Sequence, residues 1–90
     1  MRIYIKYLLW LSEVFGTKEE IVEVPGETTV AGVLRALIAR RPRAESYIRN
    51  ILSGNSEIIV LHNSMTPVNG LDTVLRDQDT ITLIPPVSGG

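Results

Sequence analysis

Residues 28–42, TTVAGVLRALIARRP, carry the pattern that decides the fold. Apolar side chains recur there every three or four residues, which is the spacing of one face of an α-helix. These side chains are Val30, Val33, Leu34, Leu37 and Ile38. Thr28 or Thr29 can cap the start of the helix, and Pro42 ends it. A helix with a single apolar stripe has to pack that stripe against another layer of the domain.

The segments before this helix predict two strands. In residues 2–9, RIYIKYLL, the side chains of Ile3, Ile5 and Tyr7 share one face, and this period of two indicates a half-buried strand. Residues 11–20, LSEVFGTKEE, predict a turn or a short helical turn that ends near Gly16. Residues 19–25, EEIVEVP, predict a second strand. Two adjacent strands joined in this way are expected to form a hairpin.

The segments after the helix complete an α+β pattern. Residues 44–52, AESYIRNIL, predict a shorter helix, and residues 57–63, EIIVLHN, form a nearly continuous apolar run that favours an interior strand. Turn residues follow in 65–73, and residues 79–86, DTITLIPP, predict the last strand. We therefore expect a mixed sheet with the main helix packed across one face, since only such packing covers the apolar stripe.

Composition limits the chain to a single domain and excludes several kinds of site. Ninety residues with 44% hydrophobic content can close one core, and the net charge of −1 does not favour nucleic acid or an anionic membrane as a partner. Cysteine is absent, so disulfides and thiolate metal sites are excluded. The apolar start of the chain is interrupted by Lys6 and is too short for a membrane span. We expect a soluble, cytoplasmic protein.

The last residues, 84–90, read IPPVSGG. Pro85 and Pro86 cannot donate to a strand ladder, so the strand should end there and the chain should leave it stiff and extended. Gly89 and Gly90 have no Cβ atom, so this end can enter a channel too narrow for a side chain. Alternatively, small residues simply accumulate at a mobile terminus. The prolines directly after the strand favour a tail that presents its carboxylate to another protein.

These residues resemble a known family. GLDTVLRDQDTITLIPPVSGG, residues 70–90, is similar to the C-terminal segment of the small subunit of molybdopterin synthase, a ubiquitin-like β-grasp sulfur carrier. LSEVFG and TTVAGVLRAL support the resemblance, while Gln78 and Ser64 depart from the family pattern within turns. The resemblance implies a β-grasp domain over residues 1–84 and an extended tail over residues 85–90.

The resemblance also implies a chemical cycle. The carboxylate of Gly90 would be adenylated by an ATP-dependent E1-like activating enzyme and converted to a thiocarboxylate with sulfur from a sulfurtransferase or cysteine desulfurase. The thiocarboxylate tail would then enter the active site of the large subunit of molybdopterin synthase and deliver sulfur to a pterin precursor of the molybdenum or tungsten cofactor. Catalytic side chains would belong to the partners, and Gly89 would give access to Gly90. The chain itself would bind no cofactor, since ATP is used by the activating enzyme.

Leu8 and Ile84 are apolar at positions that the strand alternation directs outward. Two such residues near the tail predict a docking surface for the large subunit and the activating enzyme. The other expected partner contacts lie in the tail: Pro85, Pro86, Val87 and Ser88. The alternative is that Leu8 and Ile84 are isolated surface hydrophobes, which are common.

Other polar residues have structural interpretations. Arg40, Arg41 and Arg43 cluster at the end of the main helix, where cations favour the negative pole of the helix dipole, although they could also steer an acidic partner. The one histidine, His62, has no second metal-binding side chain near it in sequence. Asp77 and Asp79 suit a turn between strands. Whether Trp10 packs within the domain or contacts a partner stays open.

Other functions are also open. Some would use the same activated chain end, and one would need no reaction at Gly90. A ubiquitin-like modifier would form an isopeptide bond between Gly90 and lysines of other proteins, and a sulfur carrier could serve another pathway such as tRNA thiolation. A β-grasp adaptor would use its surface alone, and its Gly-Gly end would be incidental.

Overall fold

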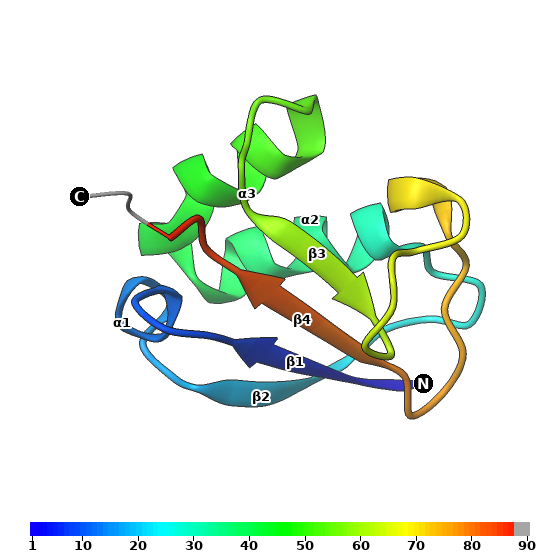
Figure 1. Ribbon diagram of the computed structural model, residues 1–90. Helices are drawn as coiled ribbons and strands as arrows, with labels where there is room; N and C mark the ends of the chain where they lie inside the picture. Colours follow the sequence, from blue (N-terminus) through cyan, green and yellow to red (C-terminus); the bar gives the residue numbers. More distant parts are fainter. Residues whose placement is uncertain (88–90) are drawn as a thin grey trace.

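The computed structural model describes residues 1–87 and contains one sheet and one helical layer. The strands are β1 (Arg2–Tyr7), β2 (Glu19–Glu23), β3 (Ile59–His62) and β4 (Thr80–Ile84). The helices are α1 (Leu11–Phe15), α2 (Val30–Arg40) and α3 (Glu45–Ser53), with short 3₁₀ turns η1 (Pro42–Ala44) and η2 (Gly70–Asp72). Figure 1 shows α2 and α3 behind the sheet, on the same side of it.

The sheet is mixed and has the order β2-β1-β4-β3. β1 and β2 form the predicted antiparallel hairpin, and β3 and β4 are also antiparallel. The two central strands, β1 and β4, are parallel, with Tyr7 opposite Leu83. Strands from the two ends of the sequence therefore lie side by side in the middle of the sheet.

One core joins the sheet to α2. Its inner sheet face is formed by Ile3, Ile5, Ile81 and Leu83, which are fully buried. The facing stripe of α2 consists of Val30, Val33, Leu34 and Leu37, all of them also fully buried. Ile38, the fifth predicted member of the stripe, is only partly buried against this core. The other four members are confirmed, and the stripe covers one side of the sheet as expected.

The helix ends follow the sequence signals. Thr29 is the N-cap of α2, and its hydroxyl accepts a hydrogen bond from the Gly32 amide at 3.1 Å. α2 stops at Arg40, before Pro42 begins η1. Gly16 and Gly54 follow α1 and α3 with φ of 83° and 81°, the left-handed conformation that glycine adopts without steric strain.

The prediction of an interior strand over residues 57–63 is wrong, because β3 is an edge strand. Val60 pairs with Leu83 and packs against the core, whereas Ile59 lies on the opposite face and is 53% exposed. The apolar run therefore does not indicate burial on both faces. Its outward members remain available on the surface.

Within residues 1–87, no helix is both long enough and apolar enough to span a lipid bilayer.

Candidate functional site

The chain leaves the sheet between β1 and β3, beside the end of β1. The Leu8 amide donates to the Leu83 carbonyl at 3.0 Å, so the two strands stay paired up to the point where β4 ends at Ile84. Pro86 is half-buried, and Val87, the last described residue, is 84% exposed. In Figure 1 this red segment continues past the tip of β4, at the same end of the molecule as α1.

Pro85 departs from the predicted accessible tail. Pro85 is buried, because it continues the inward alternation of Ile81 and Leu83, so its side chain belongs to the domain more than to an accessible tail. Ser88, Gly89 and Gly90 lie outside the described residues, and their predicted roles stay predictions.

An apolar patch lies on the outer sheet face beside this exit. Leu8 is 39% exposed and Ile84 is half-buried, and both follow residues of the inner face by one position, which places them outward as predicted. Ile59 is the direct cross-strand partner of Ile84. We call Leu8, Ile59 and Ile84 the outer patch. The sequence prediction missed Ile59, although the alternation of Ile59 with Val60 on an edge strand would have identified it.

Residues 8–10 connect β1 to α1 and are all apolar and exposed; we call them the 8–10 loop. Leu9 is 66% exposed and has φ of 51°, and Trp10 is 41% exposed. The left-handed conformation costs a leucine about 1–2 kcal/mol. The Trp10 ring also packs edge-to-face against Tyr47 of α3, with the ring centroids 6.0 Å apart. Trp10 is thus both packed within the domain and accessible on its surface.

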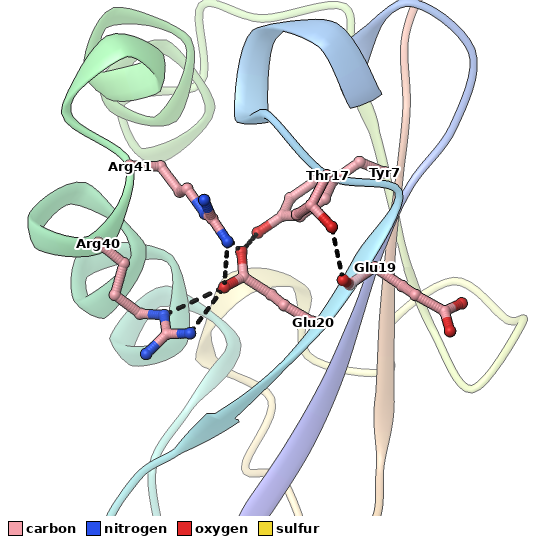
Figure 2. A network of polar contacts seen from close by, with 6 residues as sticks. All are labelled: Tyr7, Thr17, Glu19, Glu20, Arg40 and Arg41. Carbon is pink, nitrogen blue, oxygen red and sulfur yellow. Dashed lines mark hydrogen bonds and ion pairs between the residues drawn. The ribbon is translucent and has the colours of Figure 1, made fainter.

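A buried carboxylate joins the elements under this end of the sheet (Figure 2). Glu20 of β2 accepts a hydrogen bond from the Tyr7 hydroxyl at 2.5 Å and two from Arg41, both at 3.1 Å. Arg40 donates two more, at 3.1 and 2.9 Å. The Tyr7 ring stacks on Phe15 of α1, with centroids 4.0 Å apart. We call Tyr7, Glu20, Arg40 and Arg41 the Glu20 network; it ties β1, β2 and the end of α2 together.

The network sets the ionisation of its members. Burial alone would raise the pKa of Glu20, but hydrogen bonds from Arg41, Tyr7 and Arg40 outweigh burial and hold that pKa below its ordinary value. Burial, and then the hydrogen bond to Glu20, raise the pKa of the Tyr7 phenol. The Arg40 and Arg41 side chains therefore have a specific acidic partner in β2, which the helix-dipole interpretation of the arginine cluster did not foresee.

The predicted structural roles of Asp77 and Asp79 in the turn before β4 are confirmed. Asp77 accepts a hydrogen bond from the Arg2 amide at 2.7 Å. Asp79 accepts bonds from the Arg76 amide, from Asn63 and from a ring nitrogen of His62, the last at 2.7 Å. His62 is thus engaged in holding β3 to this turn. Among the residues that the structure describes, no three histidine, aspartate or glutamate side chains are grouped so that they could hold a metal ion.

A four-stranded mixed sheet wrapped around α2, with its last strand central and leading directly to the chain end, defines a ubiquitin-like β-grasp domain. The chain belongs to the ThiS family, whose model matches residues 5–90. The family and its relatives place the chain among the ubiquitin-like sulfur carriers and protein modifiers.

Three known proteins illustrate the similarity. Small archaeal modifier protein 1 of Haloferax volcanii is 34% identical over 84 residues, which cover 89% of this chain and 91% of the relative. Its crystal structure matches with a TM-score of 0.84 and 32% identity over 100% of both chains. The molybdopterin synthase sulfur carrier subunit of Drosophila erecta is 28% identical over 91 residues, covering 100% of this chain and 92% of the relative.

The third is a complex of subunits 1 and 2 of the molybdopterin-converting factor from Helicobacter pylori. One of its chains matches with a TM-score of 0.65 and 18% identity over 100% of both chains, a likeness that concerns the fold alone.

Proposed function

We propose that this chain is a sulfur carrier that acts as the small subunit of molybdopterin synthase. An ATP-dependent, E1-like activating enzyme adenylates the carboxylate of Gly90, and a sulfurtransferase or cysteine desulfurase provides the sulfur that replaces the adenylate. The resulting thiocarboxylate donates its sulfur to a pterin precursor in the active site of the large subunit. The chain binds no cofactor of its own in this cycle, which we place in the cytoplasm.

The order of these steps follows from the chemistry of a carboxylate. A C-terminal carboxyl group has a pKa of about 3.3–3.7, so it is an anion at neutral pH and resists nucleophilic attack. Adenylation converts it into an acyl group with a good leaving group. A sulfur nucleophile can then displace AMP, and the thiocarboxylate that is finally released is itself a nucleophile.

The observation that carries the proposal is the exit of the chain from β4. Strand β4 is held centrally by β1 and β3 up to Ile84, and within three residues the chain becomes exposed at Val87. The family match extends beyond that point to Gly90. A rigid base and a glycine end without Cβ atoms together support insertion of the end into a partner's active site.

The outer patch supports a protein partner at the same end of the molecule. Ile59 and Ile84 pair across the adjacent strands β3 and β4, Leu8 directly follows β1, and the three expose apolar surface beside the exit. We propose that the large subunit covers this patch; a chain of the same fold occurs in a complex of two subunits in the Helicobacter pylori structure.

A second function, protein modification through an isopeptide bond from Gly90 to lysine, is favoured by the 34% identity to an archaeal modifier protein. Both functions begin with the same adenylate. They differ in the nucleophile that receives the acyl group, which is sulfur for the carrier and a lysine amine for the modifier. A carrier for another pathway, such as tRNA thiolation, would differ only in the acceptor of the sulfur.

Intact mass spectrometry of the protein purified from its native host distinguishes these functions. The carrier predicts a mass gain equal to the exchange of one oxygen for one sulfur, lost when Gly90 is deleted. The modifier predicts Gly90 remnants on lysines of other proteins. An unmodified end under all growth conditions, together with an activating enzyme that ignores the chain, would contradict both.

A further inference from the structure

Two residues of the 8–10 loop, Leu9 and Trp10, are unusual for the surface of a stable domain. Leu9 exposes two thirds of its surface and Trp10 exposes 41%. Five non-glycine residues of the described chain have positive φ, and they are Leu9, Glu27, Asn63, Ser64 and Gln78. Leu9 is the only apolar one. The other four are polar residues in turns and loops, where a left-handed residue is common.

Trp10 adds nothing to the start of α1. It occupies the N-cap position and makes no side-chain hydrogen bond to the helix amides. The first amides of α1 donate instead to the backbone carbonyls of Leu8, Leu9 and Trp10, so the helix start does not depend on the indole ring. At position 9, asparagine would suit the left-handed backbone better than leucine does. Such local conflicts, when the fold gains nothing from them, are typical of residues kept for binding.

The loop also lies where a partner must come close. Val87 is the last described residue, and three further residues can extend by at most about 10 Å. A protein that acts on the Gly90 carboxylate therefore brings its active site within about that distance of Val87. The loop belongs to this region because the Leu8 amide is bonded to Leu83, four residues before Val87. Figure 1 shows α1 and the exit of β4 at the same end of the molecule.

We infer that Leu9 and Trp10 form a docking surface for the activating enzyme, continuous with Leu8 of the outer patch. The inference rests on the proposed function, because it requires that Gly90 be activated. The activating enzyme is the occupant that we assign because carrier and modifier both need it, whereas the large subunit serves only the carrier. Its surface beside the adenylation site should be apolar where it meets this loop.

The Glu20 network explains how so small a loop keeps its position. Tyr7 precedes the loop and is held by its hydroxyl to Glu20 and by its ring to Phe15. Trp10 rests on Tyr47 at the other side. The loop is thus fixed at both ends, and Leu9 projects between two anchored aromatic residues. Little conformational freedom has to be lost when a partner binds it.

Leu9→Asn tests the inference, because asparagine tolerates the left-handed conformation and removes the apolar surface. The full-length chain is titrated by calorimetry into the activating enzyme of the same organism, and ATP–pyrophosphate exchange is measured in parallel. We expect the melting temperature to stay equal or rise, the Kd and the KM for the chain to increase about tenfold, and kcat to be unchanged. Val68→Asn is the matched control: Val68 is 93% exposed in the connection between β3 and β4, away from the exit.

Trp10 provides a second readout, since it is the only tryptophan of the chain. Labelled with 5-fluorotryptophan, the protein should give one fluorine resonance that shifts or broadens when the activating enzyme is added. An unchanged resonance, an unchanged KM for Leu9→Asn, or a melting temperature that falls in Leu9→Asn would each overturn the inference. If the wild-type chain supported no exchange at all, the proposed function would fail and the inference with it.

Discussion

Replacing Glu20 by glutamine should destabilise the domain far more than its position in a short edge strand would indicate. The Glu20 side chain is only 6% exposed and accepts five hydrogen bonds, from one tyrosine and two arginines. Glutamine keeps the shape and one acceptor oxygen, so Tyr7 can remain bonded. What is lost is the negative charge between Arg40 and Arg41.

The size of the effect follows from the exposure of the two arginines. Arg41 is 30% exposed, and its two-point contact with the carboxylate should contribute about 1–2 kcal/mol. Arg40 is 47% exposed, so solvent screening reduces its contribution to about 0.5 kcal/mol. Glu20→Gln should therefore lower the free energy of unfolding by about 2 kcal/mol, which corresponds to a fall of about 10 °C in melting temperature for a domain of this size.

Thermal and urea unfolding, followed by circular dichroism at neutral pH, measure this loss. Glu23→Gln is the matched control on the same strand, because its pair with Arg2 has exposed side chains on both sides (73% and 59%) and should contribute under about 0.5 kcal/mol. Equal losses for the two variants would refute the assignment of the arginines to Glu20 as a stabilising contact.

The same variant has a defined pH dependence. The pKa of Glu20 is lowered by folding, so its stabilisation is fully present above the ordinary glutamate pKa of about 4.3. The stabilisation is lost as the pH falls through the lowered, folded-state pKa, where the wild-type carboxylate becomes protonated. The difference between wild type and Glu20→Gln should be constant from about pH 5 to 7 and shrink in more acid solution. A difference that persisted unchanged in strong acid would contradict the ionic origin of the effect.

Three further predictions concern the patch, the chain end and the helix cap. Ile59→Glu and Leu8→Glu should each abolish co-elution with the large subunit. The melting temperature should stay within a few degrees of wild type, because neither side chain is part of the core. Retained co-elution would exclude the outer patch as the interface. Deletion of Gly90 should eliminate sulfur transfer in an assay with purified partners while the circular dichroism spectrum stays unchanged, and residual transfer would show that the reactive end lies elsewhere. Thr29→Ala should lower the unfolding free energy, measured by urea titration, by about 1 kcal/mol through loss of the cap on Gly32, and Thr66→Ala, at an exposed position between β3 and β4, is the control.

The sequence predicted those elements whose signals are local. The α2 stripe, the Thr29 cap and the stop before Pro42 need only a helical period and one preferred residue at each end. The hairpin of β1 and β2 needs only two strand segments that are neighbours in the sequence, joined through α1. The parallel neighbourhood of β1 and β4 joins residues more than 70 positions apart, and no local pattern encodes it.

The errors and omissions have physical reasons. The apolar run in residues 57–63 could not be distinguished from a strand buried on both faces. Ile59 is apolar although it lies on the surface, so its residue type did not indicate that one face of the strand is exposed. Pro85 was expected to leave the sheet, but it extends the inward alternation of β4 by one more residue. The Glu20 network links residues 13 to 21 positions apart, so no local pattern revealed it. Leu9 adopts a left-handed conformation that leucine disfavours, so residue propensity did not predict this conformation.

The parallel pairing of the first and last strands also governs when the molecule becomes usable. β1 can pair with β4 only after the chain has been synthesised through residue 84, so a polypeptide that stops short of β4 lacks the central pair of the sheet. The central pair of strands, from which the reactive chain end emerges, is therefore the last part of the sheet to form. A large subunit that recognises Leu8 and Ile84 together would encounter that combination only on finished, correctly folded copies, which makes maturation of the domain a precondition of its assembly with this partner.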